Sequence, residues 1–404
     1  MKNDVVIIGA GHAGGMAAIS LRQRKYQGSI TLVGEERFFP YQRPALSKGF
    51  LSGELGEKTL YLKSEDYFEK KKINVLRNSK VIAIDRSQKT LLLENQKQLG
   101  YKQLIIATGS VVNKLRITNR EDVYYLRTIG DSLRIRKKLK NHKKITIIGA
   151  GYIGLEIASI AVKKNLEVKI VELENRVMGR VVSSEVSDFF QKKHQAEGVE
   201  FKFNSSITGI EPQGQQKRIL CSDGSSFNTD FVVVGVGIQP NIELAESSGL
   251  RCNNGILVND HGQTSDASVF AVGDCSNQPN KLFKKRLRLE SVSNAVEQAK
   301  SVSASIVGIQ TANQEVPWFW SDQYNINLQI TGAPESWDEL VWREGEAEEC
   351  FTLFYLENGV LVGANSINSP RDIRPARRMI AERKSANVEE LADPGIKLTD
   401  LAKR

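Results

Sequence analysis

The sequence has few cysteines and no long apolar run, and each shortage excludes a class of protein. Four cysteines among 404 residues are too few for a secreted domain held together by disulfides. The longest comparable apolar stretch, Phe231 to Ile238, is far shorter than the roughly 18 residues of a membrane-spanning helix. With 40% hydrophobic and 25% charged residues, the composition is that of a folded globular chain rather than a collagen-like, mucin-like or disordered one.

The charge is mildly basic, with a formal net charge of +9. Such an excess favours encounters with acidic partners. The basic runs at 137–144 and 283–288 are short, and each is typical of a solvated face. The N-terminal apolar run Val5–Ile8 follows an acidic residue and precedes no small-residue cleavage site, so we expect a buried first strand rather than a signal peptide. The expected compartment is the cytoplasm, without a membrane.

One pattern occurs twice: an apolar strand, a glycine-rich turn, a helix, a second strand and an acidic residue. The first copy runs from Val5–Ile8 through the turn that begins at Gly9, a helix around Met16–Leu21 and strand Ile30–Val33 to Glu35. The second copy comprises Ile145–Ile148, the turn that begins at Gly149, helix Leu155–Val162, strand Val168–Val171 and Glu172. A single G-x-G-x-x-G motif is weak, but this context is that of a dinucleotide-binding βαβ unit.

Each glycine in these turns has a physical task. The first (Gly9, Gly149) makes the tight turn, the second (Gly11, Gly151) lets a pyrophosphate approach the backbone, and the third (Gly14, Gly154) lets helix and strand pack closely. The phosphates then lie at the positive end of the helix, and the strand-end glutamate accepts hydrogen bonds from a ribose. Two sites imply two dinucleotides, which we interpret as a resident flavin and an exchanging nicotinamide. Glu172 favours NADH, although Arg176 and Arg180 nearby leave NADPH possible.

Further units of a strand followed by glycine complete the two dinucleotide-binding halves. After Pro317 the sequence pattern changes. These units are Leu104–Ala107 before Thr108-Gly109, Phe231–Val234 before Gly235, and Val269–Val272 before Gly273-Asp274; a helix is predicted over Ser291–Ile306. After Pro317 we expect short strands, with a hairpin of Phe351–Leu356 and Val360–Ala364 around Asn358-Gly359. A basic helix is predicted over Pro370–Arg383, and the polar tail after Lys384 is predicted to be loosely packed.

The sequence carries both glycine motifs, Thr108-Gly109, the run from Thr264 to Cys275 and Pro317–Gln323 (PWFWSDQ). On these motifs it resembles the FAD- and NADH-dependent ferredoxin reductases that serve bacterial oxygenase systems. The resemblance spans essentially the whole chain. It implies an α/β fold with two Rossmann-like dinucleotide-binding domains, as in glutathione reductase, and a C-terminal α+β domain. The implied boundaries are 1–113 and 243–318 for a discontinuous FAD domain, 114–242 for the NAD domain and 319–404 for the C-terminal domain.

The resemblance also assigns roles to residues. For FAD it implies the pyrophosphate cradle, the ribose carboxylate, contacts along the isoalloxazine and ribityl chain, and the adenine neighbour: Gly9, Gly11, Ala13, Gly14, Glu35, Arg43, Lys48, Val81, Thr108, Gly109, Arg127, Asp274, Val292 and Trp320. For NADH it implies Gly149, Gly151, Ile153, Gly154, Glu156, Glu172, Arg180 and Gly237. Lys48, Glu156 and Trp320 would lie nearest the reacting rings. From the residues alone, Lys48 and Glu156 could also be surface charges, Trp320 a core or interface aromatic and Asp274 a helix cap.

The implied activity is to pass electrons from NADH via FAD, one at a time, to a small acidic 2Fe–2S ferredoxin. That ferredoxin would feed a Rieske dioxygenase or a haem monooxygenase, and Lys284, Lys285, Arg286 and Arg288 could steer it. The chain itself has no cluster with metal-ligand spacing, so the iron–sulfur centre must reside on another protein. We expect no nucleic-acid partner, and either a monomer or a homodimer.

Three alternatives remain open. One is a rubredoxin reductase. A second is an NADH oxidase or peroxide-linked reductase, which the absence of cysteine from residues 38–51 and of any C-x-x-C pair disfavours. A third is a flavin- and NADH-sensing protein that binds nucleic acid, which the scattered basic residues disfavour.

Overall fold

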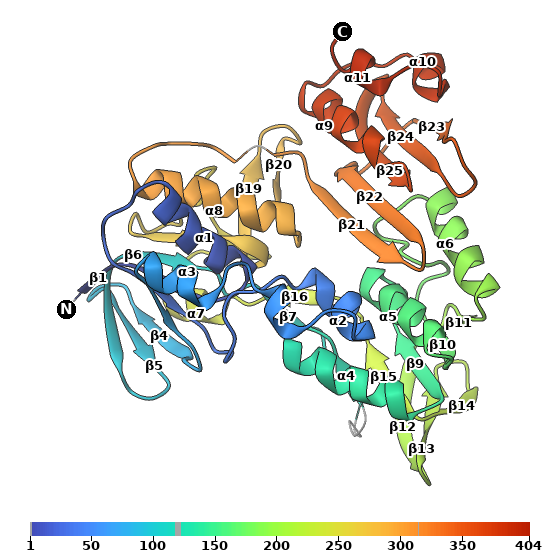
Figure 1. The fold of residues 1–404 in the computed structure, drawn as a ribbon, viewed down its shortest axis with the longest axis horizontal. Coiled ribbons are helices and arrows are strands. Elements are labelled where there is room, and N and C mark those ends of the chain that lie inside the picture. Colours follow the sequence, from blue (N-terminus) through green and yellow to red (C-terminus); the bar gives the residue numbers. More distant parts are fainter. Residues whose placement is uncertain (1, 118–122, 314) are drawn as a thin grey trace.

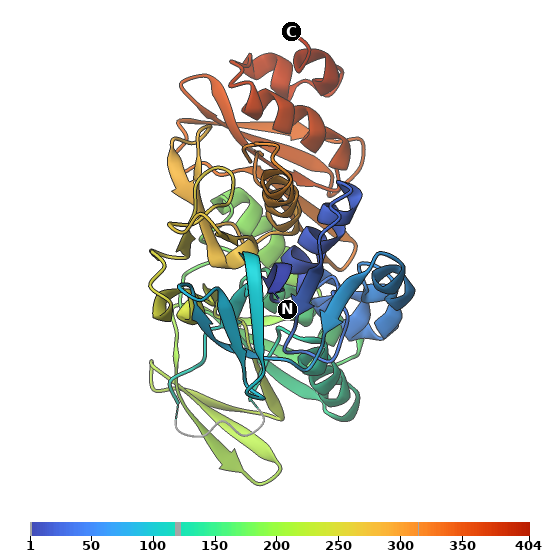
Figure 2. The same ribbon diagram turned by 90° about the vertical axis from the view of Figure 1, so that its left-hand side faces the viewer.

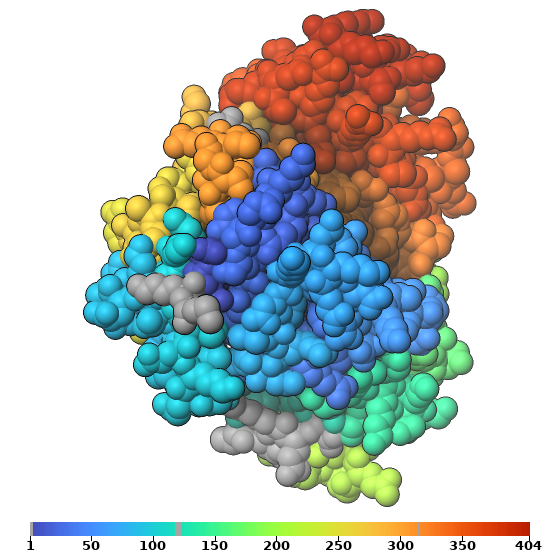
Figure 3. All heavy atoms as spheres, turned by 60° about the vertical axis from the view of Figure 1, so that its left-hand side comes forward, coloured from blue at the N-terminus to red at the C-terminus, as the bar shows by residue number. Residues whose placement is uncertain are grey.

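The computed structural model describes residues 2–117, 123–313 and 315–404. Figures 1 and 2 show three parts: a first unit built mainly from the start of the chain, a unit from the middle of the sequence, called the central unit here for its place in the sequence, and a C-terminal unit at one end. The space-filling view shows the same division, with the C-terminal segment capping one end of that face (Figure 3). None of the helices in the described ranges has both the length and the apolar character needed to cross a bilayer.

The first unit is built on a sheet whose central strands are parallel. The first predicted strand, Val5–Ile8, is buried and pairs in parallel with both Ile30–Val33 and Gln103–Ile106, as expected for an apolar run covered on both faces. In spatial order the strands are β3 (Ile73–Leu76), β2 (Ile30–Val33), β1 (Lys2–Ile8), β6 (Gln98–Ile106), β5 (Thr90–Leu93) and β4 (Val81–Asp85), with β18 (Val269–Ala271) beside β6. Because β18 joins from much later in the sequence, this unit is assembled from two distant segments.

Helices cover this sheet. α1 (His12–Gln23) packs against α8 (Val292–Ile306), so the helix that follows the first glycine turn lies beside one from the returning segment. Shorter helical elements follow between β2 and β3: η1 (Pro44–Ser47), α2 (Gly49–Ser52), η2 (Glu57–Leu60) and α3 (Glu65–Lys70). Helix α8 was predicted to within a residue of these bounds, whereas α1, predicted over Met16–Leu21, begins four residues earlier, at His12.

The central unit repeats the arrangement with a fully parallel sheet. Its strands, in spatial order, are β11 (Glu200–Lys202), β10 (Glu167–Val171), β9 (Lys144–Ile148), β15 (Phe231–Val234) and β8 (Val123–Tyr125). The helices are α4 (Ile129–Asn141), α5 (Tyr152–Lys163) and α6 (Ser184–Ala196). An antiparallel ribbon of β12 (Ile207–Gln213), β13 (Gln216–Cys221) and β14 (Ser226–Thr229) extends from it.

The two units are joined by paired crossings of the chain. β7 (Ser110–Val112) runs antiparallel to β16 (Ile238–Pro240), so the outgoing and returning segments lie side by side. The returning segment then forms α7 (Glu243–Ser247), β17 (Ile256–Leu257), η3 (Gly273–Cys275), β19 (Ser276–Asn280) and β20 (Lys285–Leu287). The predicted FAD and NAD boundaries at 113/114 and 242/243 lie close to this ribbon and stay a prediction.

The C-terminal unit is an antiparallel sheet with helices on one face. Its strands, in spatial order, are β21 (Trp318–Gln323), β22 (Ile326–Gly332), β25 (Val360–Ile367), β24 (Phe351–Glu357) and β23 (Glu339–Glu344). The predicted hairpin around Asn358-Gly359 is confirmed as β24–β25. The predicted basic helix divides into η4 (Pro370–Asp372) and α9 (Ile373–Ala381). Because Trp318 already belongs to this sheet, the predicted domain boundary at 318/319 falls inside β21.

The prediction of a loosely packed tail after Lys384 was wrong. The tail forms α10 (Val388–Ala392) and α11 (Leu398–Leu401), which bury Leu391, Leu398 and Leu401. The buried Arg343 of β23 donates hydrogen bonds to the carbonyls of Leu391, Asp393 and Ile396. The tail is polar in composition, yet three buried leucines anchor it. An arginine from a strand distant in the sequence donates hydrogen bonds to its backbone carbonyls.

Candidate functional site

A cavity of about 1930 Å³ runs between the first and central units and reaches the C-terminal sheet. Both glycine turns open into it, together with the carboxyl ends of the strands that precede them. The carboxyl edge of a parallel sheet is where open α/β folds bind ligands. The volume exceeds the roughly 300–1,000 Å³ of an ordinary small-molecule pocket, so it offers room for more than one ligand.

The first glycine turn fits a pyrophosphate. Gly9 has a φ of +105°, and a Cβ there would lie 2.1 Å from the carbonyl oxygen of Ala107. A Cβ on Gly14 would lie 1.9 Å from the Gly9 oxygen, so helix and strand pack too closely for any side chain. At Gly11, by contrast, the nearest group is the Arg43 Nη2 at 3.8 Å, which leaves space above the N-terminus of α1.

The second glycine turn has the same construction. Gly149 has a φ of +99°, and a Cβ on Gly154 would lie 2.1 Å from the Gly149 oxygen, whereas one on Gly151 would meet no protein atom within 4 Å. The strand-end Glu172 accepts a hydrogen bond from the Ala150 amide (2.6 Å). This carboxylate therefore lies against the turn, where a nucleotide bound to the turn would meet its charge.

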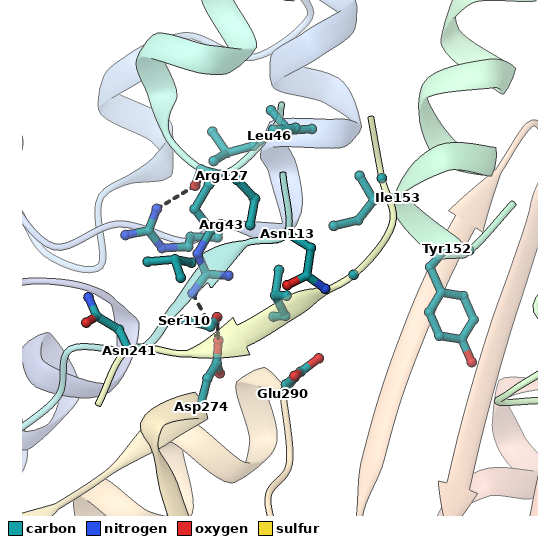
Figure 4. Close-up of a pocket in the computed structure, with 18 of the residues that line it drawn as sticks. Arg43, Leu46, Ser110, Asn113, Arg127, Tyr152, Ile153, Asn241, Asp274 and Glu290 are labelled. Atoms are coloured by element: carbon teal, nitrogen blue, oxygen red, sulfur yellow. Dashed lines mark hydrogen bonds and ion pairs between the residues drawn. The ribbon is translucent and has the colours of Figure 1, made fainter. Parts of the chain in front are cut away.

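A polar cluster lines the part of the cavity that belongs to the first unit. Arg127 pairs with Asp274 (3.0 Å), and Ser110 donates to the same carboxylate (2.7 Å). Arg43 donates to the backbone oxygen of Arg127 (2.5 Å) and pairs with Glu36 (2.9 Å). Figure 4 shows Arg43, Arg127, Ser110 and Asp274 converging from different elements, whereas Tyr152 points away. Burial lowers the pKa of Arg127, yet a guanidinium stays charged, so its charge is compensated locally by Asp274.

Lys48 and Glu156 form a buried ion pair where all three units meet. The Lys48 ammonium lies 2.6 Å from Oε1 of Glu156, whose residue is only 3% exposed. Ser321 donates to the same oxygen (2.7 Å), and Ser47 donates to Oε2. A buried carboxylate is tolerated only where such donors compensate for lost water. Lys48 follows η1, Glu156 lies on α5 and Ser321 on β21, so the pair also ties the units together.

Nearly all of the residues singled out from the sequence line this one cavity. They are Gly9, Gly11, Ala13, Glu35, Arg43, Lys48, Val81, Thr108, Gly109, Arg127, Gly149, Gly151, Ile153, Glu156, Glu172, Arg180, Gly237, Asp274, Val292 and Trp320. Gly14 and Gly154 lie beneath the turns and pack helix against strand. Trp320 stacks on Trp318, with ring centroids 5.1 Å apart. Val292 is the first residue of α8, which Ser291 caps. The individual roles remain predictions.

Several polar side chains of the site were not predicted from the sequence. Ser47 and Ser321 both donate to Glu156 although no role was predicted for either. Ser321 lies inside the Pro317–Gln323 motif that carried the resemblance, beside Trp320, and Ser47 directly precedes Lys48, but hydroxyl groups are too common in sequences to single out. Ser110 and Glu36 complete the arginine cluster.

Two basic groups are less available than the sequence suggested. Arg176 donates to the carbonyls of Gly179, Val182 and Ser183, so its guanidinium is already occupied and does not support NADPH. The run at 283–288 is likewise partly engaged by internal partners: Lys285 pairs with Glu335, Arg288 pairs with Glu290, and Arg286 donates to the carbonyl of Val258. Of the four cations expected to steer a partner, only Lys284 lacks such an engagement among the described residues.

The cysteines are placed away from the chemistry. None of the four is among the residues that line the cavity. Cys275, which follows Asp274, is buried and its thiol contacts the carbonyl oxygen of Val272. Burial raises the pKa of this thiol, which disfavours the reactive thiolate. Within the described ranges, no group of three His, Cys, Asp or Glu side chains could hold a metal ion.

Comparison with known proteins agrees with this geometry. Residues 3–299 match the family described as pyridine nucleotide-disulphide oxidoreductase, and residues 318–402 match the reductase C-terminal family. The ferredoxin--NAD(+) reductase component of a p-cumate 2,3-dioxygenase system from Pseudomonas putida is 36% identical over 99% of this chain and 98% of its own. A rubredoxin-NAD(+) reductase from Pseudomonas putida is 37% identical over 91% and 96%.

The fold also matches a solved structure closely. The putidaredoxin reductase chain of a covalent putidaredoxin reductase–putidaredoxin complex superposes with a TM-score of 0.95 and 34% identity, covering 99% of this chain and 98% of that one. The matched families together span nearly the whole sequence, and the glycine turns, the parallel sheets and the C-terminal sheet are all present. The chain therefore belongs to the pyridine nucleotide-disulphide oxidoreductase family, in the form that carries a reductase C-terminal domain.

Proposed function

We propose that this chain is an NADH-dependent flavoprotein reductase that passes electrons to a small 2Fe–2S ferredoxin serving an oxygenase. FAD, when bound, supplies the exchange between a two-electron donor and a one-electron acceptor. The relatives named as a ferredoxin--NAD(+) reductase component and as putidaredoxin reductase support this assignment. NADH is available in the cytoplasm, which is the compartment we propose.

The observation that carries the proposal is the Lys48–Glu156 pair between two glycine turns that each leave room for a pyrophosphate. Two dinucleotides bound at these turns would extend into one shared cavity. Lys48 would place a positive charge, and Glu156 an oriented carboxylate, beside the rings. Trp320, on the C-terminal sheet, would lie on the side from which a partner approaches.

The acceptor is proposed to be acidic because the reductase carries a net charge of +9. A steered encounter weakens as salt screens the charges. We propose that the chain acts as a monomer or as a homodimer.

The test is NADH-driven reduction of a panel that contains a plant-like 2Fe–2S ferredoxin, an adrenodoxin-like ferredoxin, a Rieske-type ferredoxin and a rubredoxin. We expect fast reduction of one 2Fe–2S ferredoxin, and a rate that falls as salt rises, while the bleaching of the flavin by NADH alone depends little on salt. Rubredoxin is the second candidate, since one relative at 37% identity is a rubredoxin-NAD(+) reductase.

Lys48→Met gives a sharper test of the site, with the exposed Lys58→Met as its matched control. Loss of the cation leaves Glu156 buried without its partner, so we expect NADH-driven bleaching to slow by about 10²-fold, the usual size of a lost polar catalytic group. Rapid NADH consumption with oxygen alone, unaccelerated by any ferredoxin or rubredoxin, would contradict the proposed function.

A further inference from the structure

A chain of hydrogen bonds leads away from the Lys48–Glu156 pair into the protein. Ser321 donates to Glu156 at 2.7 Å, and the amide nitrogen of Gln323 donates to the Ser321 hydroxyl at 3.1 Å. The amide oxygen of Gln323 lies 2.8 Å from Nε2 of His194, and the Tyr324 hydroxyl lies 3.0 Å from its Nδ1. None of these residues beyond Glu156 was given a role from the sequence.

The chain joins separate parts of the fold. Glu156 lies on α5 and His194 on α6, both in the central unit, whereas Ser321 and Gln323 lie on β21 of the C-terminal sheet. Ser321, Gln323 and His194 are fully buried. Buried polar side chains in such a chain have no water to replace a lost partner, so each fixes the orientation of the next.

The direction of the hydrogen bonds follows from chemistry. Burial lowers the pKa of His194 to about 4, so the ring is neutral at neutral pH and carries one N–H. The amide oxygen of Gln323 can only accept, so that N–H is on Nε2, and Nδ1 accepts from the Tyr324 hydroxyl. Every donor in the chain then points toward the Glu156 carboxylate.

We infer that His194 is a positioning residue for the reaction at the Lys48–Glu156 pair, acting through Gln323 and Ser321 to hold the Glu156 carboxylate in its orientation toward Lys48. This inference rests on the proposed function, because it deepens the role of the same pair. With His194 in place, the Gln323 amide cannot turn over, since its oxygen is held by Nε2–H. The Ser321 hydroxyl must then direct its proton to Glu156 rather than to the amide.

Apart from the Lys48–Glu156 pair itself, the charges next to this chain of hydrogen bonds lie at its outer end. Lys193, next to His194, pairs with Glu349 (3.0 Å) and Glu197 (3.8 Å). Lys163 of α5 donates to the backbone oxygen of Tyr324 (3.3 Å). Burial raises the pKa of Tyr324, and Glu197 adds to the increase, so its hydroxyl remains a donor across the working pH range. The aromatic ring of Phe201 packs against the imidazole and brings no charge.

The decisive variants are His194→Phe and Ser321→Ala. We expect each to slow NADH-driven flavin bleaching by about tenfold, the usual consequence of losing one hydrogen bond to a charged group. We also expect the pH profile of bleaching to change in both variants, because the Glu156 carboxylate is no longer held by the same donor. His194→Gln, whose amide can place an N–H near the position of Nε2, should restore much of both. His142→Phe is the matched control, because that imidazole also packs on an aromatic ring in the central unit but lies outside the chain.

Two readouts do not depend on turnover. Nitrogen NMR of histidine-labelled protein without flavin should show His194 neutral with the proton on Nε2 between pH 5 and 8. The midpoint potential of the bound flavin should differ between His194→Phe and the wild-type protein, because a carboxylate that is no longer held in place changes the charge close to the flavin.

The inference is overturned if NMR shows a charged His194 or a proton on Nδ1. It is also overturned if His194→Phe and Ser321→Ala lose activity only through lower protein yield, with unchanged pH profile and potential. If His194→Phe does not fold, Ser321→Ala and the NMR of the wild-type protein decide. Bleaching needs no ferredoxin, so the absence of a ferredoxin acceptor would sink the proposed function and leave this result standing.

Discussion

The two glycine-rich turns share one backbone design but lie in different surroundings. In both, the first glycine has a positive φ, the third packs against the first, and the second leaves open space at the start of a helix. Around the first turn, however, Arg43, Arg127 and Asp274 form a connected polar cluster. Around the second, apolar side chains stand exposed at the rim, Leu173 at 66% and Ile153 at 42%.

A dinucleotide site must both bind the phosphates and set how long the ligand stays, and the glycine motif alone meets only the first requirement. The turn supplies the phosphate cradle through backbone geometry. How long a ligand stays depends on what surrounds the rest of it, since enclosing polar partners slow release while an open rim permits exchange. We therefore expect the first turn to hold a resident cofactor and the second an exchanging one.

The strongest way to break this comparison is to place a methyl group at the third glycine of each turn. In Gly14→Ala the new Cβ would lie 1.9 Å from the Gly9 oxygen, and in Gly154→Ala 2.1 Å from the Gly149 oxygen. We expect Gly14→Ala to lose flavin and about 4 kcal/mol or more of unfolding free energy. Gly154→Ala should stay yellow but fail to bleach with NADH.

Flavin absorbance per protein, thermal unfolding and anaerobic NADH titration measure these effects. Gly11→Ala and Gly151→Ala serve as controls, because a Cβ at Gly11 would make only an ordinary contact with the Arg43 Nη2 at 3.8 Å and one at Gly151 would meet no protein atom within 4 Å. They should fold normally and weaken only the corresponding dinucleotide. Equal loss of flavin from Gly14→Ala and Gly154→Ala would show that the two turns are not specialised.

The sequence predicted the parts of the fold that local pattern controls. Strands Ile30–Val33 and Phe231–Val234 and helix α8 were found at or within a residue of their predicted bounds, because buried parallel strands and capped helices leave a direct signature. It failed on the tail after Lys384, whose packing depends on Arg343 from another strand.

The same limit applies to the site. Glycine spacing and strand-end acids are local patterns, so residues such as Gly151 and Glu172 could be predicted to line the cavity. The hydroxyl groups of Ser47 and Ser321 meet Glu156 only after three units assemble. No periodicity or spacing in the chain relates positions so far apart.

Glu172 offers a second, smaller test. Its carboxylate accepts from the amides of Ala150 (2.6 Å) and Glu174 (3.0 Å), so it is fixed at the second turn where a 2′-phosphate would lie. Glu172→Gln removes the charge repulsion between this carboxylate and the 2′-phosphate of NADPH. We therefore expect the preference for NADH over NADPH to fall by about tenfold, equivalent to about 1.4 kcal/mol. Steady-state kcat/KM for both nucleotides measures it.

Glu35→Gln is the matched change at the first turn, where the side chain is exposed and 3.5 Å from Lys80. It should leave the nucleotide preference unchanged and weaken flavin retention instead. A comparable shift in preference from both variants would mean that the carboxylates act through net charge rather than through their own sites.

The last expected effect concerns the residue after the second glycine, His12 in one turn and Tyr152 in the other. Burial and the nearby Arg43 lower the pKa of His12 from 6.5 to about 4. Between pH 6.5 and about 4, the His12 imidazole is protonated in the unfolded chain but neutral in the folded one. The unfolding free energy therefore falls as the pH falls through this window. His194 contributes in the same direction.

His12→Phe removes one of these two contributions, so we expect the loss of stability between pH 6.5 and 4.5 to become shallower, by at most about 1.4 kcal/mol per pH unit. Tyr152→Phe should leave the slope unchanged, because burial raises the pKa of that hydroxyl and keeps it neutral throughout. Urea unfolding of flavin-free protein at several pH values measures the slope. If His12→Phe keeps the wild-type slope, the pKa of His12 is not lowered by folding at the first turn. The acid sensitivity must then come from His194 and the carboxylates instead.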